Sequence, residues 1–318
     1  DSNGGNISFK VDRSSIRQGN AVIAIKDVSD AILWSWHVWV TDEDINNVIE
    51  ITNHQNVKYN FMPVNLGQCD GNTITYEERS CKVKFIAGDQ SKEITIKQLA
   101  NVIATGSNAP FYQWGRKDPL YPSNGMGNTT KIWYDKEGIP STANPMKGTF
   151  SAGNDCIKNC ILNPNLMHNR YNGDYTYYNL WSADNKTTSA NDNPVNKTIY
   201  DPCPVGFKLP ASNAFTGFTT TGESVSSSTQ VNGTWSSSEK GWYFYTNSEK
   251  TQSIFFPALG YRSYSTMRPG SIGTQGCFWS AHPVAKGNNY YLRTSSVDVQ
   301  PTYMVDRGFG YALRPCQD

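Results

Sequence analysis

Nucleophilic catalysis by a hydroxyl or a thiol needs a base beside the nucleophile and a third group that orients the base. The four histidines of this 318-residue chain stand singly, at His37, His54, His168 and His282. A Gly-x-Ser-x-Gly turn does not occur, and the nearest segment, Gly-Ser-Ile-Gly at residues 270–273, is one residue short. His37 lies in a tryptophan-rich run and His282 precedes a proline, so we interpret both as structural. The sequence therefore predicts no hydrolase site.

The cysteines offer a second kind of chemistry. Their number is seven, which leaves at least one unpaired. Cys69 and Cys81 flank Asp-Gly-Asn at residues 70–72, which is typical of a hairpin turn, so they could join two adjacent strands. Cys156 and Cys160 are another candidate pair. The alternative is a reduced set of small buried side chains.

Metal ligands are sparse. The pair Cys156 and Cys160 has no second cysteine pair or histidine cluster beside it to complete a zinc site. Asp155, Asp174 and Asp184 have a spacing that fits no ordered calcium loop such as an EF-hand. Glycine-rich phosphate-binding motifs are absent as well. We therefore predict neither a metal nor a cofactor.

The composition indicates a secreted, β-rich protein. Charged residues make up 17% and aromatic residues 13%, and the chain holds 26 glycines and 16 prolines. A net charge of +1 gives no general attraction to nucleic acid. The longest apolar run, residues 21–25, is too short to cross a bilayer, so no membrane insertion is expected. For an exported protein we also expect a targeting segment upstream of the linker-like residues 1–5.

The elements that would position any site are mainly short strands. Within an N-terminal part, residues 1–48, we predict a meander with strands at residues 6–12, 21–25 and 32–40. Because residues 32–40 are apolar on both faces, we expect that strand to be central and buried. Residues 82–86 and 92–99 alternate cleanly and predict a hairpin with one wet face.

The rest of the chain divides into two parts of one predicted domain, residues 1–318. Residues 120–198 are rich in Asn, Ser, Thr, Gly and Pro and predict a loop-rich insertion. Residues 201–318 contain short aromatic runs bounded by turn residues, which is typical of strands, and residues 211–218 favour a short helix. We expect Trp235 and Trp279 to lie in the core.

Several segments occur in the order of a known module. These are Cys-Pro-Val-Gly-Phe-Lys-Leu-Pro at residues 203–210, Ala-Leu-Gly-Tyr-Arg at 258–262 and Gly-Tyr-Ala-Leu-Arg-Pro-Cys at 310–316, preceded by Phe-Tyr-Gln-Trp-Gly-Arg-Lys-Asp at 111–118. With them the chain resembles the Fibrobacter succinogenes major paralogous domain, a secreted bacterial module similar to C-type-lectin-like and sulfatase-modifying-factor folds. Residues 32–42 resemble the opening segment of this module in Bacteroides fimbrillin-type tip adhesins.

The resemblance implies an α+β, mostly β, C-type-lectin-like fold with an N-terminal β meander and long loop insertions. It implies an exported adhesin at the cell surface or in a fimbrium, outside the cell. The expected partners are a glycan, a host or bacterial surface protein, and other pilus subunits. We expect no catalysis. The alternatives are a sulfatase-modifying-type or glycan-processing enzyme, and a purely structural pilus subunit.

The resemblance also implies particular residues. In lectin-like folds a long loop holds the ligand, which points to Tyr264 and Arg268, and by position to Tyr121 and Tyr175. The Glu-Pro-Asn and Gln-Pro-Asp triplets of calcium-dependent lectins are absent. A disulfide between Cys203 and Cys316 would close the C-terminal part, and a bridge over a loop of this length stabilises by roughly 4–5 kcal/mol. That pairing leaves Cys277 alone, which argues against a catalytic cysteine pair.

Overall fold

The structure is a computed structural model that describes residues 9–69, 73–104, 109–121, 133–134, 140–141, 153–168 and 177–318. The described chain is mostly β, built from several small antiparallel sheets. Its helical segments are few and short: α1 (Gly153–Leu162) and the 3-10 turns η1 (Arg13–Ser15), η2 (Ser212–Phe218), η3 (Ser228–Gln230) and η4 (Ala285–Gly287).

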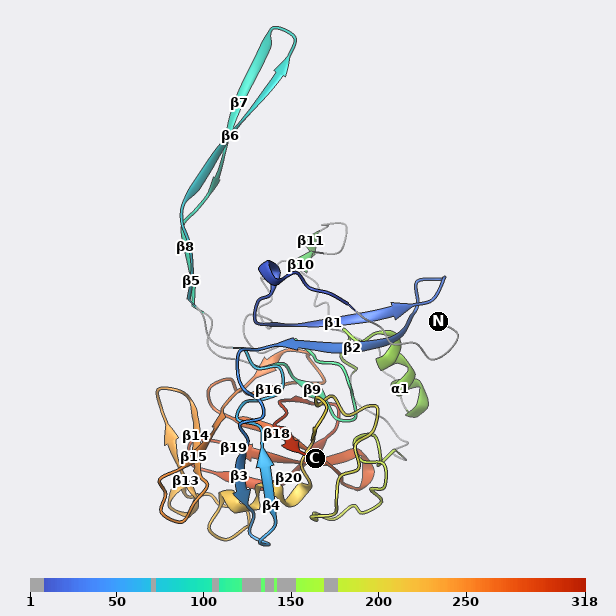
Figure 1. The fold of residues 1–318 in the computed structure, drawn as a ribbon, viewed down its shortest axis with the longest axis vertical. Helices are drawn as coiled ribbons and strands as arrows, with labels where there is room; N and C mark the ends of the chain where they lie inside the picture. Colours follow the sequence, from blue (N-terminus) through green and yellow to red (C-terminus); the bar gives the residue numbers. More distant parts are fainter. Residues whose placement is uncertain are drawn as a thin grey trace.

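Four small sheets form the body of the molecule (Figure 1). One places the C-terminal strand between two segments distant in the sequence, in the order β12 (Phe207–Lys208), β22 (Cys316–Gln317), β4 (Lys58–Phe61) and β3 (Ile49–Thr52). A second sheet has the order β13 (Gly233–Ser236), β14 (Gly241–Tyr245) and β15 (Ser253–Pro257). A third has the order β17 (Pro269–Gly270), β16 (Tyr261–Arg262), β21 (Gly310–Tyr311) and β9 (Tyr112–Gln113). The fourth has the order β18 (Gly276–Pro283), β19 (Asn288–Thr294) and β20 (Val299–Asp306).

Two-stranded ribbons lie outside these sheets (Figure 1). β1 (Gly19–Lys26) and β2 (Ile32–Val40) form a ribbon that lies across the body, with α1 near one end. β5 (Thr73–Tyr76) with β8 (Asn101–Ala104), and β6 (Arg79–Ala87) with β7 (Gln90–Gln98), form a long arm that projects away from the body. A last pair is β10 (Trp133–Tyr134) with β11 (Pro140–Ser141).

The core consists of two aromatic clusters because the strands supply aromatic side chains on their inner faces. In the first, the rings of Phe218 and Phe244 stack with centroids 3.9 Å apart, and Phe256 meets Phe218 edge-on at 5.0 Å. In the second, Trp279 and Tyr311 lie 4.5 Å apart. Trp279 is fully buried, as expected from the sequence, whereas Trp235 is partly buried at the edge of the first cluster.

The N-terminal strands differ from the prediction. Residues 21–25 and 32–40 do form strands, but residues 9–12 are not a strand, and residues 6–8 lie outside the described part. The predicted meander is therefore a two-stranded ribbon. Among the described strands β2 pairs with β1 alone, and it is half-buried rather than central. The strand was predicted to be central because both of its faces are apolar, but its outer face contributes to a groove and not to the interior of a sheet.

The hairpin at β6 and β7 is confirmed, but it has no dry face. Every residue of β7 is exposed, and on β6 only Val83 is partly buried. Alternation along the sequence indicates that one face is apolar, and it carries no information on whether anything covers that face.

The seven cysteines all lie in the described part of the chain, and no disulfide joins any two of them there. The turn predicted at residues 70–72 between Cys69 and Cys81 lies outside the described residues. Cys81 lies opposite Ile96 in the arm, in a hairpin whose turn falls at Gly88 and Asp89. Cys203 and Cys316 are buried in neighbouring segments, since Lys208 of β12 pairs with Cys316 of β22. Strand pairing thus joins the two segments without a bond between the sulfurs.

Candidate functional site

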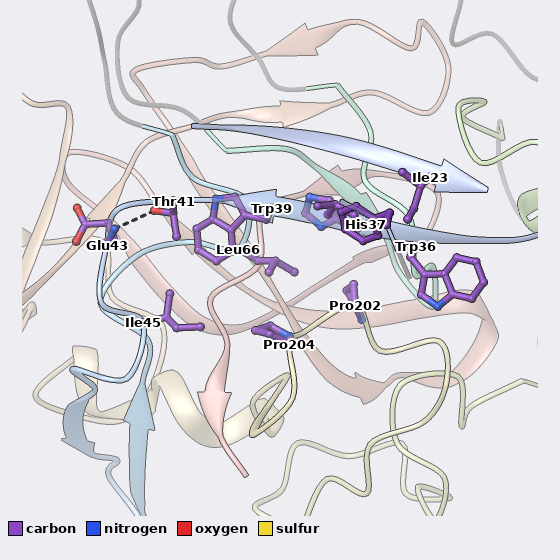
Figure 2. Close-up of a pocket in the computed structure, with 12 residues that line it drawn as sticks. Ile23, Trp36, His37, Trp39, Thr41, Glu43, Ile45, Leu66, Pro202 and Pro204 are labelled. Carbon is purple, nitrogen blue, oxygen red and sulfur yellow. Dashed lines mark hydrogen bonds between the residues drawn. The ribbon is translucent and has the colours of Figure 1, made fainter. Parts of the chain in front are cut away.

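A long groove runs along β2, and Ile23 of β1 also lines it (Figure 2). It consists of two adjoining hollows with volumes of about 870 Å³ and about 710 Å³. Both are lined by Trp36 and His37 on β2 and by Pro202 and Pro204 on the facing segment. We call this the β2 groove. Its lining is completed at one end by Trp39, Ile45 and Leu66, and at the other by Trp34, Ile199 and Val205.

The groove exposes an open strand edge. The Nζ of Lys117 donates to the backbone carbonyl of Ser35 at 2.9 Å, which indicates that this carbonyl points away from β1. Because backbone groups alternate in direction along a strand, those of His37 and Trp39 point to the same side. Pro202 and Pro204 have no N–H and cannot extend the sheet from the opposite wall.

The three tryptophans of β2 differ in how firmly their side chains are held by neighbouring residues. Trp34 packs on Tyr200 with centroids 6.2 Å apart, and the ammonium of Lys117 lies 4.5 Å from its ring centroid. The indole N–H of Trp39 donates to the carbonyl of Gln68 at 2.9 Å. Trp36 is 39% exposed and presents its ring to solvent in the groove. The groove therefore has two fixed aromatic walls and one accessible aromatic face.

His37 is a structural residue of the groove floor. Its Nε2 lies 2.8 Å from the amide oxygen of Asn20, and its Nδ1 lies 2.9 Å from the hydroxyl of Tyr112. These partners assign the proton to Nε2, so that Nδ1 accepts from the Tyr112 O–H. Burial lowers the pKa of His37 to about 4, although the nearby carboxylate of Asp118 opposes this shift. Both ring nitrogens are engaged in a neutral imidazole.

Ser35, Lys117 and Asp118 form a buried polar cluster, of which Ser35 and Lys117 line one end of the groove. Lys117 Nζ donates to the Ser35 hydroxyl at 2.5 Å and to Asp118 Oδ2 at 2.6 Å, while the Ser35 hydroxyl donates to Asp118 Oδ1 at 2.8 Å. Burial lowers the pKa of Lys117, and the hydrogen bond and charge of Asp118 oppose it. The three N–H groups of the Lys117 ammonium all donate to oxygen atoms, and these bonds anchor β2 to the body. In this protonated form Lys117 has no lone pair and cannot act as a base.

The residues proposed from the sequence lie elsewhere. Tyr121 is 40% exposed and lines a separate cavity of about 540 Å³ beside β1. Tyr264 is partly buried, with its ring edge-on to Phe309 at 4.9 Å. Arg268 is exposed. Tyr175 lies outside the described residues.

Arg262 links two of these regions. Its Nη2 donates to the carbonyl of Tyr121 at 2.9 Å, and its Nη1 donates to the carbonyl of Met267 at 2.7 Å. The structure thus brings the Tyr121 backbone and the loop of Tyr264 and Arg268 to one arginine, but neither of these loop residues lines the β2 groove.

Sequence reasoning did not find the β2 groove or the buried polar cluster. Lys117 and Asp118 lie more than 80 residues from Ser35, and Pro202 is further still. One signal was present: Ser35, Lys117 and Asp118 are polar residues inside otherwise apolar and aromatic segments. Such residues are buried only when they have partners, so the three point to one another.

The described residues also bear on metals and membranes. Among them, no group of three or more His, Cys, Asp or Glu side chains could hold a metal ion. Cys156 and Cys160 are buried on α1. A hydrogen bond from Cys156 lowers the pKa of Cys160 well below its usual value against the effect of burial, and Arg116 and His168 add to the lowering. Within the described part of the chain, no helix has the length and apolar character to cross a bilayer.

Comparisons with protein-family models, curated proteins and solved structures give no match to this chain.

Proposed function

We propose that this chain is an exported surface adhesin that holds a neutral glycan chain in the β2 groove without transforming it. The proposal takes its class, a C-type-lectin-like module of a cell-surface or fimbrial protein, from the sequence resemblance. Its ligand site comes from the groove rather than from the loop of Tyr264 and Arg268.

The observation that carries the proposal is the exposed ring of Trp36 in an elongated, aromatic-lined hollow. Rigid indole faces bind the C–H faces of sugar rings at little cost in conformational entropy. Two cations near the groove are neutralised, Lys117 by Asp118 at 2.6 Å and Lys197 by Asp201 at 2.8 Å. This pairing favours an uncharged ligand over an anionic one.

The test is binding of the purified chain to a broad panel of glycans, followed by calorimetric titration of the best ligand. We expect Trp36→Ala to weaken binding by about fivefold or more, because truncating an aromatic anchor of a binding site costs more than about 1 kcal/mol. A chelator is expected to leave the affinity unchanged.

The matched control is Tyr303→Ala. Tyr303 is also a large exposed aromatic residue, 46% accessible, but it lies on β20 and does not line the groove. Equal weakening by both variants, or a panel without any glycan ligand, would contradict the proposal. Release of a shortened or modified glycan, detected by mass spectrometry, would favour the enzymatic alternative.

The second candidate function is that of a structural pilus subunit. The projecting arm favours it, because elements that leave the body of a protein commonly serve assembly. Incorporation into fibres together with a lack of any ligand would support this role over adhesion.

A further inference from the structure

The arm formed by β6 and β7 exposes side chains that a soluble protein usually covers. Phe85 is 57% exposed, Ile94 43% and Ile96 56%. The two strands pair with each other and with no third strand among the described residues. Figure 1 shows the arm extending away from the body, so the body of its own chain does not cover it.

The strand register divides the arm into an apolar and a polar face. Residues directly opposite each other in an antiparallel pair share a face. One face consists of the pairs Cys81–Ile96, Val83–Ile94 and Phe85–Lys92, with Arg79–Gln98 and Ala87–Gln90 at its ends. The other carries Ser80–Lys97, Lys82–Thr95, Lys84–Glu93 and Ile86–Ser91.

An isolated two-stranded ribbon is marginally stable in water, and further strands or a packed surface are needed to stabilise it. The apolar face is therefore the place where another surface would add stability. This requirement does not depend on the function proposed for the β2 groove.

We propose that the apolar face of the arm packs against the same face of a second copy of this chain. A two-fold contact requires a self-complementary patch, and the register supplies one centred on Val83 and Ile94. When two arms stack face to face about this centre, each of the two cations on the apolar face lies against an uncharged residue of the second copy. Arg79 meets Ala87 in an antiparallel stack or Gln98 in a parallel one, and Lys92 meets Ile96 or Phe85 respectively.

The charges favour a second copy over a lipid surface. Residues 79–98 carry five cationic and two anionic side chains, a net charge of +3. Three of the cations, Lys82, Lys84 and Lys97, lie on the polar face. With the apolar face against a bilayer they would point away from anionic headgroups, whereas in a stack of two arms they remain in water.

The size of the contact sets its strength. Nine residue pairs give a ribbon about 30 Å long and about 10 Å wide, hence about 300 Å² per face. A standard protein interface buries about 800 Å² on each partner. The dimer should therefore be weak and depend on concentration. The whole arm, residues 73–104, carries five cationic and four anionic side chains, and Glu78 pairs with Lys97 at 2.8 Å. Two arms of net charge +1 repel each other weakly, so added salt should strengthen the association slightly.

The test is sedimentation velocity over a concentration series, in reductant so that Cys81 cannot form a disulfide. The variants are Ile94→Lys on the apolar face and its neighbour Thr95→Lys on the polar face, which add the same charge at exposed positions. We expect the wild type to dimerise slightly more in high salt than in low salt. Ile94→Lys should weaken the dimer about tenfold or more, and Thr95→Lys should leave it within about twofold.

Three outcomes would overturn the proposal. The first is a wild type that stays monomeric up to about 1 mM. The second is an equal effect of the two substitutions on dimerisation. The third is binding of a monomeric protein to anionic vesicles, abolished by Ile94→Lys and not by Thr95→Lys. The third would assign the arm to a lipid surface. Loss of dimerisation with glycan binding intact would leave the proposed function standing.

Discussion

At the scale of single residues, two histidines are held neutral by their surroundings. Burial lowers the pKa of both His37 and His282 to about 4. In the unfolded chain their pKa is about 6.5, so the unfolded state binds protons in a range where the folded state does not. These residues therefore destabilise the fold as the pH decreases from about 6.5 towards 4.

Between pH 7.5 and pH 5.5 the free energy of unfolding should fall by about 1.3 kcal/mol for each of these histidines. Carboxylates titrate mainly below this window. Urea denaturation of His282→Gln at both pH values should show a drop smaller by that amount than in the wild type. His54→Gln, the same substitution at an exposed position, is the comparison variant. An identical drop in all three proteins would contradict this assignment.

The cysteines differ in accessibility, which predicts an order of reaction. Cys81 is exposed on the arm, whereas Cys277 and Cys316 are 1% and 2% exposed. Burial also raises the pKa of both of these thiols to about 12, which suppresses the reactive thiolate. Alkylation of the folded protein followed by peptide mass spectrometry should label Cys81 first and the two buried thiols only after unfolding.

Two results of that experiment would be informative against the structure. Labelling of Cys316 as fast as that of Cys81 would contradict its burial. Recovery of Cys203 and Cys316 as one linked peptide would establish the disulfide that the resemblance implies and the structure lacks.

At the scale of elements, the sequence predicts strands well where they pair with a neighbour in the chain. The hairpin of β6 and β7 falls where alternation places it, and β13, β15, β18 and β19 lie in the part, residues 201–318, whose aromatic runs predicted strands. The turn η2 lies at residues 212–218, inside the predicted helix. These elements are encoded by periodicity within a few residues.

The β2 groove could not be predicted in the same way. Its walls, β2 and the segment of Pro202 and Pro204, are some 160 residues apart in the sequence. Whether an apolar strand lies in a sheet interior or beside a groove depends on its long-range partners. Trp36 has the same local pattern in both cases, so the sequence of β2 alone favoured a central strand.

At the scale of the whole molecule, the two ends of the body are held together by hydrogen bonds. The N–H of Met62 donates to the carbonyl of Pro315 at 2.9 Å, and the N–H of Leu66 donates to the carbonyl of Leu313 at 3.0 Å. Arg314 lies between these bonds, 1% exposed and with its guanidinium 4.4 Å from the ring centroid of Phe256. The pairing of β12 with β22 takes the place of the predicted disulfide. Arg314 holds the same C-terminal segment to residues 62–65.

Arg314 should be the residue on which this closure depends most. Its guanidinium donates to Asn65 Oδ1 at 2.7 Å and to the carbonyls of Pro63 at 2.9 Å and Phe255 at 2.8 Å. Burial lowers its pKa to about 9, so it remains a cation at neutral pH. Arg314→Met would leave these acceptors unpaired, and each buried unpaired group costs about 1–3 kcal/mol. We expect a loss of about 3 kcal/mol or more in the free energy of unfolding, measured by urea denaturation.

The control is Arg268→Met, which removes the same charge from an exposed position and should change stability by less than about 0.5 kcal/mol. Arg314→Lys distinguishes charge from geometry, because lysine keeps the cation but lacks the planar fork that reaches several carbonyls at once. We expect its stability to lie between those of the wild type and Arg314→Met. If Arg314→Met lost no more stability than Arg268→Met, the strand pairing of β12 and β22 would have to close the body without the arginine.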